Sequence, residues 1–188
     1  MASKSLLESI NPKGHLEIIK KYSDGHEETV LNDHNVITAG MGITLAHLFA
    51  NTSLTVGVDS FGIGNFQIGT TSGSMVSSTL ALTAPISEVE YGDTDLTLNT
   101  IYIAGTGNQI SAIINPVYIS KTTSTKVTYS LVLEEGAANG LSVQEIGLFS
   151  RNPGNHAPAV SYLCAYRSFA GISKNGSFAL IFKWTLEF

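Results

Sequence analysis

The C-terminal segment constrains the fold more than any other part of the chain. Between Phe178 and Phe188, large apolar side chains occupy every second position, and smaller or polar side chains fill most of the positions between them. Such alternation is typical of a β-strand with one buried face, because neighbouring side chains of a strand point to opposite sides of the sheet. The segment therefore predicts a half-buried strand. Its expected core side chains are Phe178, Leu180, Phe182, Trp184, Leu186 and Phe188.

Two hairpins are expected. Residues 15–31 contain two strand-like runs separated by Ser23-Asp24-Gly25, and Asp-Gly tolerates the positive φ angles that tight hairpin turns need. The charge gathered in this hairpin predicts a solvated or edge position. A second hairpin is expected from residues 161–169 and 178–188, with Asn175-Gly176 at its turn.

The rest of the chain predicts one helix and a series of short strands. A helix is expected over residues 38–50, with Thr38 as its cap and with Met41, Leu45, Leu48 and Phe49 on one face. Residues 70–79 are Ser- and Thr-rich and predict a flexible linker. Apolar runs between Gly, Ser, Thr and Asn predict further strands. These strands are expected at residues 61–70, 96–104, 110–120, 126–133 and 142–149.

Composition narrows the class of protein. The chain has 188 residues, of which 43% are hydrophobic and 13% charged, and this combination excludes a disordered chain. With a net charge of −5, the chain does not have the excess of basic residues that is typical of a nucleic-acid-binding protein. No apolar run approaches the length of a membrane span, and the start of the chain has no signal-peptide pattern, so we expect synthesis in a cytosol. The low fraction of charged residues also indicates that part of the surface is buried against other subunits.

These observations predict a mainly β fold. We expect a single β-sandwich or jelly-roll-like domain over residues 15–188, preceded by an N-terminal arm at residues 1–14. The domain would include the hairpin at residues 15–31 and the short helix at residues 38–50.

The sequence offers no catalytic constellation. The five histidines are scattered, and the single cysteine, Cys164, cannot build a zinc cluster, so a packed thiol is expected there. The glycines between Gly62 and Gly69 do not match a dinucleotide-binding pattern. We therefore predict no catalytic, cofactor-binding or metal-binding residue, no cofactor, and a protein that is not an enzyme.

Several acidic and aromatic residues have two interpretations. Glu88 and Glu90 would share one face of a strand, as a polar surface or as a hydrolytic pair. Asp93 and Asp95 fit a solvated turn or the start of a calcium loop. Aromatic side chains would either join the core or form a sugar-binding surface. The residues are Tyr162, Tyr166 and Phe169 for a platform, and Tyr91, Tyr102 and Tyr118 for exposed contacts.

Four motifs, taken in their order along the chain, resemble those of a known protein family. They are Asp33 to Gly42 (DHNVITAGMG), Phe66 to Thr70 (FQIGT) followed by Thr79-Leu80, Glu145 to Phe149 (EIGLF), and Phe169 to Lys174 with the terminal WTLEF. Together they span nearly all of residues 15–188. In this order they resemble a family of bacteriophage virion proteins of the tail, collar or fibre region.

The resemblance implies a non-enzymatic structural protein of the virion, made in the bacterial host cytoplasm. Its expected partners are copies of itself, in a trimer or another ring, and other virion proteins of the tail, neck or capsid. The alternatives are a capsid decoration protein and a carbohydrate-binding module that contacts a host-surface glycan. No nucleic acid or membrane partner is expected.

The matched residues also have physical interpretations. Gly40 and Gly69 would allow tight turns or a close approach of backbone, and Glu145 would accept backbone or lysine hydrogen bonds. The Gly/Ser/Thr loops and the N-terminal hairpin are the expected contact surface. Deletion of residues 1–31 is therefore expected to impair assembly without loss of folding.

Overall fold

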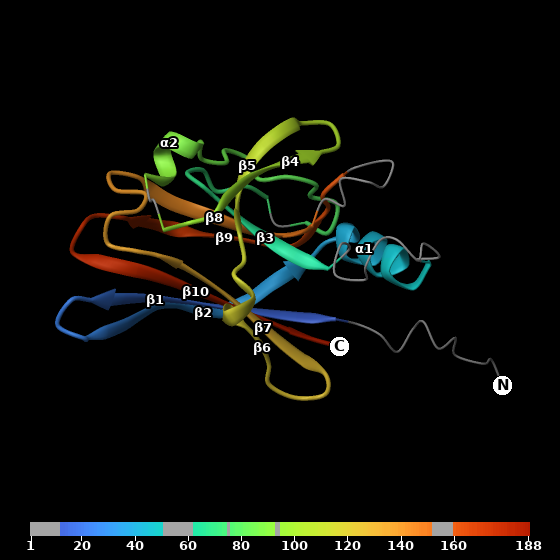
Figure 1. Ribbon diagram of the computed structural model, residues 1–188, viewed down its shortest axis with the longest axis horizontal. Coiled ribbons are helices and arrows are strands. Elements are labelled where there is room, and N and C mark those ends of the chain that lie inside the picture. Colours follow the sequence, from blue (N-terminus) through green and yellow to red (C-terminus); the bar gives the residue numbers. More distant parts are fainter. Residues whose placement is uncertain (1–11, 51–61, 75, 93–94, 152–159) are drawn as a thin grey trace.

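The computed structural model describes residues 12–50, 62–74, 76–92, 95–151 and 160–188. As predicted, the chain is mainly β: a curled, 10-stranded sheet has the order β4-β5-β3-β8-β9-β2-β1-β10-β7-β6, with every pair antiparallel (Figure 1). The strands are β1 (Lys13–Tyr22), β2 (Glu27–Ile37), β3 (Ile63–Gly69), β4 (Leu98–Ile103), β5 (Gly107–Ile113), β6 (Ile119–Lys121), β7 (Lys126–Leu133), β8 (Ser142–Ser150), β9 (Leu163–Ser173) and β10 (Phe178–Glu187). The helices are α1 (Ala39–Ala50), α2 (Glu88–Tyr91) and the 3₁₀ turn η3 (Pro116–Tyr118).

The sheet curls into two leaves that face each other. The lower leaf contains β2, β1, β10, β7 and β6, and the upper leaf contains β4, β5, β3, β8 and β9 (Figure 1). The leaves join where Val36 and Ile37 at the end of β2 pair with β9. Across the core, the ring centroids of Phe66 from the upper leaf and Trp184 from the lower leaf lie 6.3 Å apart. The fold is therefore sandwich-like, with the core between the leaves.

Strand β10 confirms the alternation found in the sequence. Its apolar face is buried from Phe178 to Leu186, whereas Phe188 lies beyond the strand and is 43% exposed. β10 lies between β1 and β7 and pairs with both of them. The C-terminal strand is therefore a central strand of the lower leaf.

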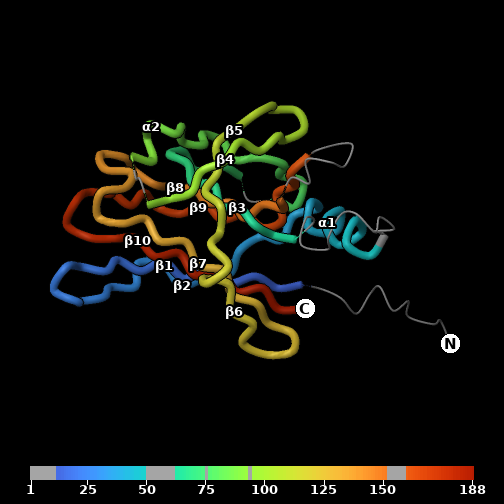
Figure 2. The backbone as a smooth tube through the Cα atoms, viewed as in Figure 1, coloured from blue at the N-terminus to red at the C-terminus, as the bar shows by residue number. Residues whose placement is uncertain are grey.

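The second predicted hairpin is wrong. β9 and β10 follow each other in the chain, but β9 pairs with β8 and β2 and not with β10. The connection passes from the upper to the lower leaf at the end of the molecule that also carries the β1–β2 turn (Figure 2). Asn175 instead forms a local turn, in which its Oδ1 accepts a hydrogen bond from the Ser177 amide at 2.9 Å.

The first hairpin is confirmed, but its predicted edge position is wrong for β1. Gly25 has a φ of +86°, and Asp24 Oδ1 accepts a hydrogen bond from the His26 amide at 2.8 Å. β1 lies between β2 and β10 and buries Leu16 and Ile18 completely. Deletion of residues 1–31 would therefore remove a central strand, so an assembly defect in that variant does not by itself separate a lost contact surface from a lost fold.

Helix α1 only partly follows its prediction. Met41 is buried, but Phe49 is 82% exposed, so the expected apolar face is incomplete. Thr38 does not act as a simple side-chain cap, because its hydroxyl donates to the Leu163 carbonyl of β9. α1 is thus attached to the upper leaf. Within the described residues, no helix is long and apolar enough to cross a membrane.

Three further local predictions are corrected. The strand expected at residues 110–120 is interrupted after Ile113, because the chain turns through η3 before β6 begins. Glu88 and Glu90 lie in helix α2 rather than in a strand, and the Glu90 carboxylate accepts a hydrogen bond from the Ser87 amide at 2.7 Å. The described part of residues 70–79, expected as a linker, contacts the upper leaf, where the Gly73 amide donates to the Tyr166 hydroxyl at 3.1 Å.

Candidate interaction surface

Glu145 is a fully buried acidic residue, and it fastens a loop to the upper leaf. Its carboxylate on β8 accepts hydrogen bonds from the amides of Thr83 (3.0 Å) and Ala84 (2.7 Å) and from the Tyr166 hydroxyl (2.8 Å). Burial, followed by the hydrogen bond to Glu145, raises the pKa of Tyr166 to about 12, so its phenol remains a donor at neutral pH. The prediction that Glu145 accepts backbone hydrogen bonds is confirmed.

The two motif glycines lie where backbone approaches closely. A Cβ atom on Gly69 would lie 2.5 Å from Glu145 Oε1 and 2.6 Å from the Ala84 carbonyl oxygen. A Cβ atom on Gly40 would overlap the carbonyl oxygen of Leu163. Only glycine fits at either position without a shift of backbone, which confirms the close approach predicted from the sequence.

Two further motif residues, Asn35 and Lys174, are used inside the protein. Asn35 Oδ1 accepts a hydrogen bond from Trp184 Nε1 at 3.0 Å and thereby connects β2 to β10. Lys174 is only 2% exposed, and its ammonium group donates to the carbonyl oxygens of Glu135 (3.0 Å) and Asn175 (2.9 Å). The polar residues of the four motifs therefore hold backbone segments in place.

The structure shows which of the aromatic and thiol candidates are buried and which are exposed. Tyr91 and Tyr166 are completely buried, so neither can be an exposed ligand contact. Tyr102 and Tyr118 are 44% and 48% exposed. Cys164 is buried as predicted, and burial raises the pKa of its thiol to about 12.

The remaining candidates do not form a described cluster. Tyr162 stacks on His47 with ring centroids 5.8 Å apart, and Phe169 is half-buried. Asp93 lies outside the described residues, so the calcium-loop alternative has no described geometry. In the part of the chain that is described, no group of three or more His, Cys, Asp or Glu side chains is placed to hold a metal ion.

A polar groove lies between the start of β1 and the end of β10. It has a volume of about 330 Å³ and contains His15, His34 and Lys126 in its lining. The two histidine rings meet edge to face, with centroids 5.7 Å apart, and Lys126 pairs with Glu187 at 3.2 Å. These side chains form cross-strand contacts on the open face of the lower leaf.

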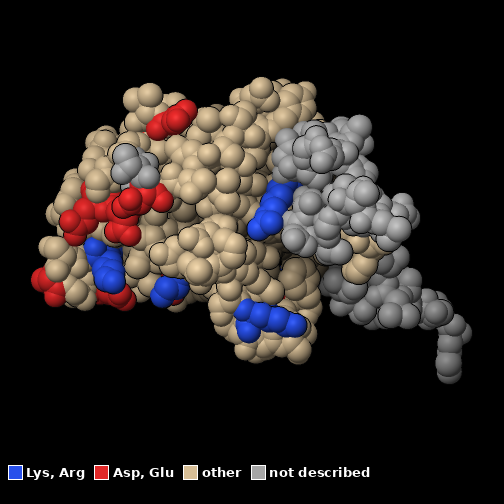
Figure 3. Space-filling model, in the orientation of Figure 1, with Lys and Arg blue, Asp and Glu red and all other residues tan. Residues whose placement is uncertain are grey.

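One sequence feature that the predictions above did not use is a long uncharged stretch. Residues 96–120, which form β4, β5, η3 and the start of β6, contain no Asp, Glu, Lys, Arg or His. Figure 3 shows a broad area free of charged side chains in the middle of this view, while the acidic residues gather towards one end. Tyr102, Val117 and Tyr118 are its exposed large apolar residues. The absence of charged residues between positions 96 and 120 can be read directly from the sequence and could have identified this face.

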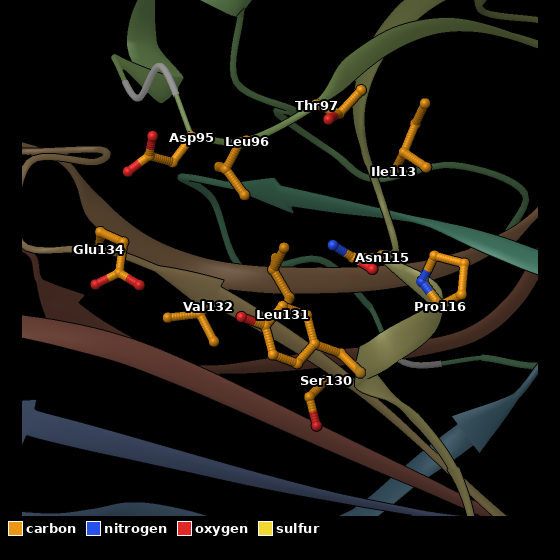
Figure 4. A pocket seen from close by; sticks show the side chains of 11 residues that line it. Asp95, Leu96, Thr97, Ile113, Asn115, Pro116, Ser130, Leu131, Val132 and Glu134 are labelled. Atoms are coloured by element: carbon orange, nitrogen blue, oxygen red, sulfur yellow. The ribbon is translucent and has the colours of Figure 1, made fainter.

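A pocket of about 370 Å³ borders the uncharged face, at the open seam between the leaves. Leu96 and Ile113 line its upper side, and Leu131 of β7 lies on its lower side (Figure 4). Asp95 and Glu134 lie at the end of the pocket away from Pro116 (Figure 4). Here the β4–β5 end of the curled sheet faces the β6–β7 end without pairing with it.

Comparisons with protein-family models, with curated proteins and with solved structures find no match to this chain.

Proposed function

We propose that this chain is a non-enzymatic structural subunit of a bacteriophage virion, which assembles by homo-oligomeric packing at the tail, neck or fibre attachment region. The observation that carries the proposal is the uncharged face of β4, β5 and η3. Burying a charged group against a neighbouring subunit is costly unless that group is paired. A face built from residues 96–120 avoids this cost and still offers Val117, which is 78% exposed, for apolar contact.

The four sequence motifs support the same proposal. Gly40, Gly69, Glu145 and Lys174 belong to the motifs that resemble phage virion proteins, and each of them fixes backbone inside the chain. This use of polar residues suits a protein whose task is to hold a shape. A closed ring or trimer is the expected assembly, because most soluble oligomers have closed symmetry.

The first test is the solution mass of the purified chain, measured by light scattering at low and high salt. We expect a salt-resistant trimer or larger ring of the 19.9 kDa chain, since apolar contacts are not screened by salt. Val117→Asp should shift the mass towards the monomer. Val89→Asp is the matched control, because Val89 is 88% exposed but lies on α2, outside the uncharged face. A monomeric wild-type chain would overturn homo-oligomeric packing through this face.

The virion assignment has its own test. Antibodies against the recombinant chain, applied to phage particles from a culture that carries its gene, should label the tail, neck or fibre base in electron micrographs. Label on the head would favour the capsid decoration alternative, and unlabelled particles would contradict a place in the virion.

A glycan-binding role is the second candidate, and the two exposed tyrosines favour it. Tyr102 and Tyr118 belong to the same uncharged stretch, and exposed aromatic rings can pack against sugar rings. A glycan array should then give a signal that Tyr118→Ala weakens. Absence of any signal from the wild-type chain would eliminate this candidate.

A further inference from the structure

Strand β7 has an unpaired backbone edge at the open seam. β7 pairs with β10 along Lys126–Leu133, but β6 covers its other side only at Val127, Thr128 and Tyr129. Within the described ranges, residues 130–133 have no ladder partner on that second side. In an antiparallel ladder, alternate backbone groups point away from the paired strand, so this edge presents donors and acceptors that no described residue pairs with.

The seam beside this edge has room for a further strand. The pocket of about 370 Å³ is lined by Ser130, Leu131 and Val132 along the edge and by Leu96 and Ile113 opposite it (Figure 4). A strand added next to β7 would point alternate side chains inward, against Leu96 and Ile113, and the others outward. The inner side chains of such a strand would therefore be apolar.

The charge at one end of the seam indicates what kind of strand fits. The exposed Glu134 lines one end of the pocket, and the uncharged residues 96–120 supply no basic group there. The chain as a whole carries a net charge of −5. A lysine or arginine at the matching end of the incoming strand would complement the Glu134 carboxylate.

We infer that the seam takes an extended segment of a different polypeptide by β-strand addition to Ser130–Leu133. The segment carries alternating apolar side chains and a basic residue at the Glu134 end. Strand addition gives affinity through main-chain hydrogen bonds and specificity through side-chain pockets. The inference rests on the proposed assembly function for the source of this strand, a partner protein of the particle. The binding itself is a property of the isolated chain.

The test is a titration of the full chain with a synthetic peptide, Lys-Val-Thr-Val-Thr-Val. Its lysine is placed first because antiparallel addition brings the peptide's N-terminal end next to Glu134. We expect amide chemical-shift changes and slower hydrogen exchange at residues 130–133. A peptide with glutamate in place of lysine should bind about tenfold more weakly, and Glu134→Gln should weaken the lysine peptide about threefold.

Two controls separate strand addition from unspecific binding. A peptide N-methylated at alternate residues keeps its side chains but cannot donate the ladder hydrogen bonds, so it should not bind. Glu27→Gln removes one exposed negative charge from the distant β1–β2 hairpin and should leave the affinity unchanged. Equal binding of the N-methylated and unmodified peptides would overturn the inference.

Failure of strand addition can be distinguished from failure of the proposed homo-oligomeric assembly. The titration is repeated on Val117→Asp, and the mass of each sample is measured by light scattering. Binding at residues 130–133 by a monomeric chain would support strand addition although homo-oligomeric packing had failed. No binding by either chain would overturn strand addition, whatever their masses. Slow exchange of these amides in the free chain that disappears on dilution would assign the edge to a second copy, and would overturn the assignment to a basic partner.

Discussion

The two leaves of the sheet are held together in different ways. In the lower leaf, every residue of β10 has a partner in β1, and the ladder to β7 is also uninterrupted. In the upper leaf, register shifts interrupt the pairing of β8 with both of its neighbours, β3 and β9. Buried polar side chains such as Glu145 and Asn65 occur in this irregular leaf. The lower leaf also has one register shift, in the β1–β2 ladder at Ile18 and Ile19, but both ladders of its central strand β10 are continuous. In the upper leaf the central strand β8 is bulged on both sides, and its Glu145 carries the hydrogen bonds that attach a neighbouring loop.

The largest effect should come from the centre of the lower leaf. Trp184→Ala removes a fully buried ring between the leaves and leaves Asn35 Oδ1 without its donor. We expect a loss of about 3–5 kcal/mol in the free energy of unfolding, measured by urea denaturation. Thr185→Val, at the adjacent position on the half-buried opposite face, should cost less than about 1.5 kcal/mol. Equal losses in the two variants would show that the alternation does not define the core.

A smaller loss is expected from the polar contacts of the upper leaf. Glu145→Gln keeps the shape of the side chain but replaces one acceptor oxygen with a donor, which faces either the Ala84 amide or both the Thr83 amide and the Tyr166 hydroxyl. We expect a loss of about 2 kcal/mol in unfolding free energy. Hydrogen exchange of the Thr83 and Ala84 amides should also become faster. Unchanged exchange at both amides would contradict the role given to Glu145, and Glu134→Gln serves as the exposed control.

Alkaline pH should weaken the folded state through buried groups of both leaves, namely Cys164 and Tyr166 in the upper leaf and Tyr129 in the lower leaf. Burial raises the pKa of Cys164 from its ordinary 9.0 to about 12, so the unfolded chain loses this proton at a lower pH than the folded chain. The stabilising contribution is complete below pH 9 and is lost as the pH rises towards 12, with a slope of up to about 1.4 kcal/mol per pH unit. Tyr166 adds a similar loss between pH 10 and 12.

Urea unfolding at several pH values between about 8.5 and 10 checks this linkage within the range where the free thiol titrates. Cys164→Ala should give a flatter pH dependence than the wild-type chain. Identical slopes would mean that the thiol ionises at the same pH in the folded and unfolded states.

The smallest effect should come from the surface of the lower leaf. Lys126 and Glu187 form an ion pair at 3.2 Å, but their side chains are 40% and 48% exposed. Lys126→Gln should therefore change the unfolding free energy by less than about 1 kcal/mol, and added salt should reduce that difference. A loss as large as that of Glu145→Gln would show that surface charge contributes as much as the buried contacts.

The sequence predicted those parts of the fold that local pattern determines. Alternation located β10, Asp24-Gly25 located the first turn, and the motif glycines marked the close backbone contacts at Gly40 and Gly69. Ser87 and Glu90 have the spacing of a helix-capping box, so the short helix α2 could also have been predicted from the sequence.

Local sequence patterns did not predict the pairing of the strands or the open seam between the leaves. Asn175-Gly176 looks like a hairpin turn, but the choice between β9 and β1 as the partner of β10 depends on the packing of both leaves. The free edge at Ser130–Leu133 depends on β6 being only three residues long, which Pro116 and the 3₁₀ turn before it help to determine. Such features depend on distant segments, and no local pattern records them.

The place of β10 in the sheet also sets the order in which the protein can fold. β10 is the last described strand in chain order, yet it lies between the first, β1, and β7. Until β10 emerges from the ribosome, β1 and β7 each lack a neighbour, and their apolar faces have no complete leaf to join. Pairing between segments so far apart in the chain slows folding and leaves strand edges exposed during synthesis. Because β10 follows both of its neighbours in the chain, the lower leaf is completed only after the other described strands have been synthesised, and until then the edges of β1 and β7 stay open to unwanted pairing.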